Sequence, residues 1–493
     1  MKSIFYILFF TLLSFEGIAQ INFPPLRAAA GNYNAPLVST NLVNSITPTT
    51  VSTGGNLANT GGKNVTDKGI VVSTSSGPTI SSYIKKNVDP SPNSIGDFTS
   101  NLTGLTPNTL YYIRAYATNS IGTSYGAEKT FNTIPTGTVL SLTGEIWMDK
   151  NLGATQAATS ISDAASYGDY YQWGRPTDGH QIYNTANETT VQLNSYIENS
   201  LFVFGHGISW INQPYDQFWQ GPAGYYNPCP TGYAVPTEAE WKAEMATWSS
   251  QDAAGAFASP LKLPLAGMRT FSGGPTSVLI EQSSSGYYWS STATSRINFG
   301  QWENIARRFR IQSNSNYWFS SSSVAGSSCR CIKRLSVGES YQGGVIVYLL
   351  NSGDIGYDEN KQHGLIAANY ISEPYTWNNG SYILTNASGE VIGTGAANTN
   401  AIISSQGNTG TYAAKVCKDY RGGGYSDWYL PSFNEFLQYL YNSAGFYSDY
   451  RKDWYYWTST ETGTAYAWAY HGRFENKTKD ALNYGRVVPF RSF

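Results

Sequence analysis

Charged side chains are scarce in this sequence of 493 residues: Asp, Glu, Lys and Arg make up 13% of it, and the formal net charge is −2. The sequence has no run of Lys and Arg, so the electrostatic basis for binding nucleic acid is missing. No stretch after the first 20 residues is apolar enough for long enough to cross a membrane. A P-loop, a nucleophile elbow and an EF-hand loop are also absent. These absences argue against a nucleic-acid-binding protein, a membrane-spanning protein and the common nucleotide-binding enzymes.

Metal and cofactor ligands are equally sparse. The four histidines are dispersed, and no close pair has the spacing of zinc ligands. Residues 354–360 offer oxygen atoms for calcium, but their spacing matches no calcium motif, so a solvated loop explains them more simply. Residues 393–398 lack the third glycine of a dinucleotide fingerprint and are interpreted as a turn into a helix. We therefore expect no catalytic residue, no metal site and no cofactor; calcium is chemically possible but unsupported by a motif.

What the chain has in abundance is glycine and tyrosine, with 49 and 38 copies. This composition is typical of a β protein rich in loops, and the length predicts two to four domains. At the N-terminus, Lys2, the apolar run 4–15 and the small residues 17–19 predict a secretion signal over 1–19. The alternative is a buried N-terminal strand. We expect the mature protein to be extracytoplasmic, at the cell surface, secreted or periplasmic, with residues 20–36 as a linker.

The second half of the sequence contains the same series of blocks twice. The pairs are residues 235–241 and 430–436, 287–292 and 455–460, and 330–333 and 486–491. The first pair contains Pro-Thr/Ser-x-x-Glu, which predicts a capping box at the start of a helix, made by Thr237 with Glu240 and by Ser432 with Glu435. Paired catalytic acids are the alternative for the two glutamates. Three matched blocks in one order predict two copies of one fold, separated by insertions of unequal length.

The second pair of blocks places a tryptophan, Trp289 or Trp457, in an aromatic run that ends in hydroxyl residues. A buried ring with Ser and Thr bonded to nearby backbone is one interpretation. A sugar-stacking platform is the other. Retention in both copies favours the scaffold, because ligand-binding residues need not survive duplication together.

All four cysteines lie in the repeated half, and an exported chain can oxidise them. Cys229 and Cys331 stand at the two ends of one copy, so we expect a disulfide between them. Cys329 is the rival partner, since side chains two apart in a strand share a face. Cys417, among Ala413, Ala414 and Val416, is expected to be a buried small hydrophobe.

Residues 37–133 alternate short strands with turns, and Tyr112, Arg114 and Tyr116 alternate with apolar neighbours as in a half-buried strand. This pattern predicts a β-sandwich. The segments 102–109 and 111–119 resemble a fibronectin type III module, whose packing corner matches the leucine-to-tyrosine stretch. Such modules are usually spacers or adhesive units.

Two further resemblances cover the repeated half. Residues 138–335 resemble the Fibrobacter succinogenes major paralogous domain, through the segments 147–152, 167–173, 229–237, 289–292 and 329–333. Residues 341–493 resemble the C-terminal domain of the Legionella collagen-like protein, through 343–348, 363–368, 424–432 and 457–461. Both families are similar to the C-type-lectin-like fold. The resemblances imply a mainly β chain in which a β-sandwich precedes two tandem C-type-lectin-like α+β domains.

These resemblances lead to an expected function. The chain should be a non-enzymatic binding or adhesion protein that recognises an extracellular glycan or protein through its loops. The calcium-dependent lectin triplet is missing here, which puts calcium-mediated sugar binding in doubt. An enzyme related to sulfatase-modifying factors and a structural envelope component without a soluble ligand are the alternatives. The candidate ligand-binding aromatics, expected to be exposed on the insertions, are Trp210, Tyr215, Phe218, Trp219, Trp377 and Tyr382. Core packing is the alternative for each of them, because Tyr and Trp are so frequent in this chain.

Overall fold

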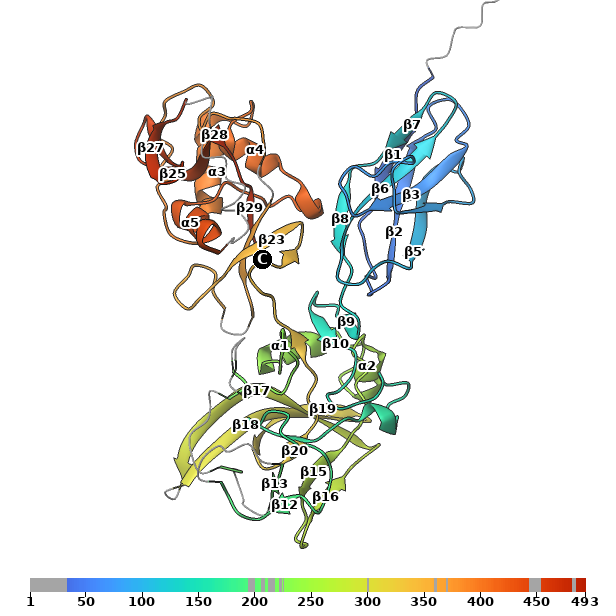
Figure 1. Ribbon diagram of the computed structural model, residues 1–493. Coiled ribbons are helices and arrows are strands. Elements are labelled where there is room, and N and C mark those ends of the chain that lie inside the picture. Colours follow the sequence, from blue (N-terminus) through green and yellow to red (C-terminus); the bar gives the residue numbers. More distant parts are fainter. Residues whose placement is uncertain are drawn as a thin grey trace, which may run out of the picture.

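The structure is a computed structural model. It describes residues 33–193, 200–204, 209–211, 218–220, 224, 226–298, 301–358, 361–368, 371–442, 454–480 and 485–493. Strands predominate over helices, and three units follow one another along the chain (Figure 1). We call them the sandwich (β1–β8), the middle unit (β9–β21) and the last unit (β22–β29). Among the described residues, no helix is long and apolar enough to cross a membrane.

The sandwich packs two antiparallel sheets against each other. One sheet has the order β1-β2-β5, and the other has the order β4-β3-β6-β7 with β8 also paired to β6. The strands are β1 (Leu37–Thr40), β2 (Thr50–Asn59), β3 (Asp67–Ser73), β4 (Lys85–Val88), β5 (Gly96–Thr103), β6 (Leu110–Thr118), β7 (Thr123–Tyr125) and β8 (Lys129–Asn132). The predicted β-sandwich is therefore confirmed.

A tyrosine corner closes the sandwich at the start of β6. The hydroxyl of Tyr111 accepts a hydrogen bond from the Thr106 backbone amide at 2.9 Å, and the Tyr111 ring is buried. Along β6, Tyr111, Ile113 and Ala115 face the core, as the alternation in the sequence predicts. The packing corner expected from the leucine-to-tyrosine stretch is thus present.

The middle unit combines three larger sheets, in the orders β14-β21-β10-β9, β11-β20-β15-β16 and β17-β18-β19, with a short parallel pair, β12-β13. Its strands are β9 (Thr138–Leu140), β10 (Ile146–Met148), β11 (Tyr171–Gln172), β12 (Glu188–Thr189), β13 (Phe202–Val203), β14 (Tyr233–Ala234), β15 (Met268–Phe271), β16 (Ser277–Ile280), β17 (Ser285–Asn298), β18 (Gln301–Gln312), β19 (Ser315–Ser322), β20 (Gly326–Ser327) and β21 (Ile332–Lys333). Its helices are η1 (Ala164–Ser166), α1 (Glu238–Met245) and α2 (Ala253–Ala258).

The last unit contains two four-stranded sheets, β22-β23-β24-β29 and β27-β26-β25-β28. Its strands are β22 (Ser340–Tyr341), β23 (Gly344–Leu349), β24 (Gly364–Ala367), β25 (Tyr455–Glu461), β26 (Tyr466–Tyr470), β27 (Phe474–Thr478), β28 (Gly485–Arg486) and β29 (Phe490–Ser492). Its helices are α3 (Gly395–Gln406), α4 (Ala413–Asp419), η2 (Gly422–Gly424) and α5 (Phe433–Asn442). The C-terminus lies beside β23, near the centre of the molecule (Figure 1).

Both predicted capping boxes are present. At α1, Thr237 Oγ1 accepts from the Glu240 amide at 3.1 Å, and Glu240 Oε2 accepts from the Thr237 amide at 2.8 Å. At α5, Glu435 Oε2 accepts from the Ser432 amide at 2.8 Å, and the Ser432 hydroxyl accepts a longer bond of 3.4 Å. The carboxylates of both glutamates therefore satisfy orphan amides at a helix start.

The structure contains the predicted disulfide between Cys229 and Cys331, with a Cα–Cα distance of 6.0 Å. It joins the entrance of α1 to the closing strand of the same unit across 102 residues. Cys329 and Cys417 are free and fully buried. Cys417 lies in the apolar core of the last unit, in agreement with its interpretation as a small hydrophobe.

Candidate functional site

The blocks that occur twice in the sequence make matching contacts in the two units. The indole of Trp289 donates to the Tyr171 carbonyl at 2.7 Å, and that of Trp457 donates to the Tyr375 carbonyl at 2.9 Å. Both tryptophans are fully buried. Each ring is therefore enclosed by its own unit and cannot offer a face to a sugar, so the scaffold interpretation holds.

The hydroxyl residues after each tryptophan hold the helix entrance in the same way in both units. The Ser291 amide donates to the Pro236 carbonyl at 2.7 Å, and the Ser459 amide donates to the Pro431 carbonyl at 2.7 Å. One residue further on, Thr292 and Thr460 each accept a 3.0 Å bond from the first amide of α1 or α5. The threonine hydroxyls therefore have a structural role in both copies.

The two units share a fourth matched block, which was not predicted from the sequence. The indole of Trp173 donates to the Ser290 carbonyl at 2.8 Å, and that of Trp377 donates to the Thr458 carbonyl at 2.8 Å. Trp377 is thus the counterpart of Trp173, and both are buried scaffold residues. The signal was available as Tyr-x-Trp at 171–173 and 375–377, but tyrosine and tryptophan are too frequent here for that motif to stand out.

Four of the aromatics predicted to bind a ligand are buried, so their expected exposure was wrong. Trp210, Trp219 and Trp377 expose 1% or less of their surface, and Phe218 exposes 6%. The indole of Trp210 donates to the Trp173 carbonyl at 2.7 Å, and that of Trp219 donates to the Tyr226 carbonyl at 2.9 Å. The described aromatics of this stretch, Trp210, Phe218 and Trp219, pack into the core of the middle unit, because burying those rings stabilises the unit more than exposing them. Tyr215 lies outside the described residues.

Tyr382 is the predicted aromatic that the structure does expose. It belongs to a short loop, residues 381–385, in which three consecutive large side chains face solvent; we call this the Tyr382 loop. Tyr382 exposes 47% of its surface, Ile383 41% and Leu384 54%. Three adjacent exposed side chains of this size make the Tyr382 loop a candidate interaction site.

A buried ion pair holds the Tyr382 loop from beneath. Lys479 and Glu461 form a salt bridge in which the two side chains are 0% and 2% exposed. Lys479 Nζ also donates to the Ile383 carbonyl at 3.1 Å and lies 4.6 Å from the ring centre of Trp377. Glu461 accepts from the Thr385 amide and hydroxyl at 2.9 Å and 3.0 Å. The backbone of the loop is therefore fixed while its apolar side chains stay outside.

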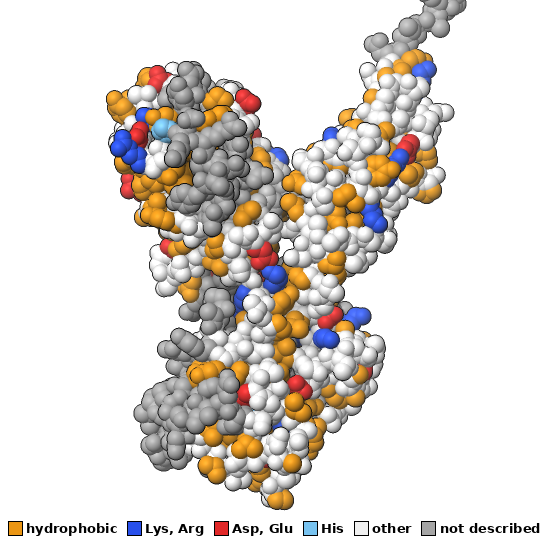
Figure 2. All heavy atoms as spheres, viewed as in Figure 1, with side chains coloured by type: hydrophobic (Ala, Val, Ile, Leu, Met, Phe, Trp, Pro, Cys, Tyr) orange, Lys and Arg blue, Asp and Glu red, His pale blue; other side chains and the backbone are white. Residues whose placement is uncertain are grey.

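Asp480 and Tyr466 lie near Tyr382 and, together with the Tyr382 loop, form an exposed corner of the last unit. The Tyr382 hydroxyl is hydrogen-bonded to the Asp480 carboxylate; this bond raises the pKa of Tyr382 and lowers the pKa of Asp480. Tyr466, at the start of β26, is 49% exposed. The corner thus combines two tyrosine rings, an exposed carboxylate and aliphatic side chains. Figure 2 shows how sparse charged side chains are on the visible face of the molecule, where orange hydrophobic side chains appear on all three units.

Thiol or metal chemistry would need a reactive thiol or a cluster of metal-ligating side chains. Burial raises the pKa of the Cys329 and Cys417 thiols well above the ordinary value. In the described parts of the chain, no three His, Cys, Asp or Glu side chains come together in a way that could hold a metal ion. In the described part of the loop at 354–360, Asp354 accepts from the Asn351 amide and the Tyr348 hydroxyl.

A buried polar network surrounds His180 in the middle unit. His180 is fully buried; its Nδ1 is 2.5 Å from Asp178, and its Nε2 accepts from the Gln172 amide at 3.0 Å. Asp178 also binds Arg175 at 2.8 Å, and Arg269 donates to the His180 carbonyl. Burial, and after it the positive charge of nearby Arg175, lower the pKa of His180 to about 3. The imidazole is therefore neutral in the folded protein.

This burial predicts a loss of stability in acid. Because the folded pKa of about 3 is below the unfolded value of 6.5, the stabilisation is complete above pH 6.5 and is lost as the pH falls. Lowering the pH from 6.5 to 4.5 should cost the middle unit about 2–3 kcal/mol through this one group. Urea unfolding at both pH values should show a steeper pH dependence for the wild type than for His180→Gln. Equal slopes would show that His180 does not titrate on unfolding.

Comparison with known proteins identifies no family for the whole chain. No protein-family model matches the sequence, and the search of curated proteins found no match. The structural neighbours are fibronectin type III and other β-sandwich domains. The sensor domain of the anti-sigma factor RsgI4 of Pseudobacteroides cellulosolvens is 14% identical, with a TM-score of 0.16, covering 21% of this chain and 97% of that one. The sixth fibronectin type III domain of human fibronectin type III domain containing protein 3 is 16% identical, with a TM-score of 0.17, covering 22% and 94%.

Proposed function

We propose that this chain is an exported, non-enzymatic binding protein that recognises a glycan or a protein through loops of two related α+β units. The two units would be C-type-lectin-like, and the sandwich would be a fibronectin type III-like spacer. The observation that carries the proposal is the Tyr382 loop, in which a buried ion pair fixes the backbone beneath three exposed apolar side chains. A surface that is already ordered loses little entropy when a ligand binds, which favours affinity.

The chemistry of the corner favours a glycan. Tyrosine rings stack on the apolar faces of sugar rings, while a carboxylate accepts hydrogen bonds from hydroxyl groups. Tyr382, Tyr466 and Asp480 bring these groups to one corner. Ile383 and Leu384 add area that would also suit an apolar patch on a protein. No calcium ion is required by this arrangement.

Two further features support export and the absence of an enzymatic role. The predicted signal over 1–19 and the disulfide between Cys229 and Cys331 both fit an oxidising, extracytoplasmic compartment. An enzyme of the sulfatase-modifying type would need a reactive thiol. The two free thiols are fully buried, and burial raises their pKa, which makes them poor nucleophiles.

A glycan and polysaccharide array tests the proposal. The double variant Tyr382→Ala/Tyr466→Ala should lose at least about tenfold in affinity for any glycan the wild type binds, which is about 1.4 kcal/mol. The fold should be unaffected, because both rings are half exposed. Tyr357→Ala, which removes a tyrosine 42% exposed at another place on the last unit, is the matched control and should bind like the wild type. Unchanged binding by the double variant would place the site elsewhere, and a silent array would contradict glycan recognition.

A further inference from the structure

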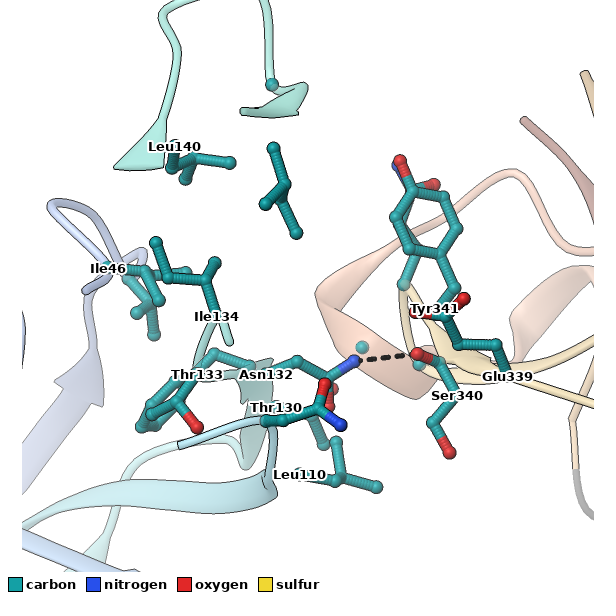
Figure 3. Close-up of a pocket in the computed structure, with 18 of the residues that line it drawn as sticks. Ile46, Leu110, Thr130, Asn132, Thr133, Ile134, Leu140, Glu339, Ser340 and Tyr341 are labelled. Atoms are coloured by element: carbon teal, nitrogen blue, oxygen red, sulfur yellow. Dashed lines mark hydrogen bonds between the residues drawn. The ribbon is translucent and has the colours of Figure 1, made fainter. Parts of the chain in front are cut away.

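A cavity of about 400 Å³ lies where the three units meet. Its lining comes from segments far apart in the sequence: the sandwich, the β9–β10 hairpin of the middle unit, and the segments around β22 and η2 of the last unit. Figure 3 shows apolar side chains of the sandwich and the hairpin on one side and Glu339, Ser340 and Tyr341 of the last unit on the other. Its size and its place between units are typical of sites for small molecules.

The two walls of this junction cavity differ in chemistry. Ile46, Leu110, Ile134, Leu140 and Ile146 form an aliphatic wall. Across the space, the Asn132 side-chain amide donates to the Ser340 carbonyl at 3.1 Å, the bond drawn in Figure 3. The cavity therefore offers an apolar wall to a ligand body and a polar edge to a head group.

The charged side chains of the cavity lining leave one positive charge without a partner in the lining. Three charged side chains line the cavity, and two of them, Lys333 and Glu339, neutralise each other in a salt bridge. The third is Lys129 on β8; among the described residues, no carboxylate lies within salt-bridge distance of it. The lining thus carries one uncompensated positive charge beside an aliphatic surface.

We propose that the junction cavity binds an amphipathic small molecule with a single negative charge. Its apolar body would lie against Leu110, Ile134 and Leu140, where leaving water is favourable, and its anionic group would pair with Lys129. Because the lining belongs to all three units, such a ligand would also hold the sandwich against the last unit.

A fluorescence titration with 8-anilinonaphthalene-1-sulfonate tests this site in the folded, full-length chain. The dye is apolar and carries one sulfonate, so one saturable site per chain is expected. Dodecanoate should displace it, whereas dodecyltrimethylammonium, which has the same chain and the opposite charge, should compete at least tenfold less well. Absence of saturable binding, or equal competition by the two amphiphiles, would overturn the proposal.

Variants place the dye in the cavity. Leu110, on β6 of the sandwich, and Leu140, on β9 of the middle unit, line the cavity from two different units. Leu110→Trp and Leu140→Trp each fill the space, and both should lower the dye affinity at least tenfold. Lys129→Gln changes a partly exposed side chain and should weaken dye and dodecanoate about fivefold to tenfold with the fold intact. Lys150→Gln removes an equivalent charge outside the cavity and should change neither. If Lys129→Gln and a correctly folded tryptophan variant bind like the wild type, the dye site is elsewhere and the assignment is wrong.

Discussion

Replacing Lys479 with methionine should lower the unfolding free energy of the last unit by about 3–5 kcal/mol, the usual cost of removing one member of a buried ion pair. Lys479 is fully buried, and its partner Glu461 is 2% exposed at the side chain. Without the ammonium group, the carboxylate stays buried with only the Thr385 amide and hydroxyl as partners. Hydrogen exchange in increasing denaturant measures this local stability.

Two controls separate the ion pair from other effects of the substitution. Lys477→Met removes a lysine two residues away whose salt bridge to Glu475 is more exposed, so it should cost less than about 1 kcal/mol. The double variant Lys479→Met/Glu461→Gln removes both charges and should recover part of the loss. A Lys479→Met protein as stable as the wild type would mean that the ion pair does not support the Tyr382 loop.

Trp289→Ala and Trp457→Ala should each destabilise their own unit by about 3–5 kcal/mol, the range for truncating a buried large side chain. The two losses should be similar, because both indoles are fully buried and donate to a carbonyl at the same place in the repeated framework. Guanidinium unfolding followed by tryptophan fluorescence measures them.

Trp210→Ala and Trp468→Ala give the comparison. Trp210 is 1% exposed and should behave like the framework tryptophans. Trp468 lies on β26, is partly exposed and donates to the Glu390 carboxylate at 3.2 Å, so its removal should cost clearly less. A Trp289→Ala protein that keeps its stability but loses a ligand would mean that Trp289 belongs to a binding site and not to the scaffold.

Local rules predicted much of the framework from the sequence. The capping boxes depend on residues three apart, and the β6 pattern depends on alternation, so each can be derived from neighbouring positions. The Cys229–Cys331 pairing followed from the position of the two residues at the ends of one repeated copy. Matching blocks identified buried scaffold because both copies keep the same contacts.

The candidate site was harder to predict, since exposure is set by tertiary packing. Nothing in the sequence around Trp210 or Trp219 says whether these side chains face solvent or the core, and both are buried. The pair of Lys479 with Glu461 joins residues 18 apart, and its role under residues 381–385 depends on a loop nearly 80 positions upstream. The junction cavity depends on contacts among all three units, so no local pattern encodes it.

Hydrogen exchange at the Thr385 amide of the wild-type protein tests the account most directly. This amide belongs to an irregular loop beside exposed side chains, yet it donates to buried Glu461. If the Tyr382 loop is fixed from beneath, the amide should exchange as slowly as those of β25, and the protection should disappear in Lys479→Met. Exchange as fast as that of an unprotected surface loop would contradict the proposal that this chain presents a preformed binding surface.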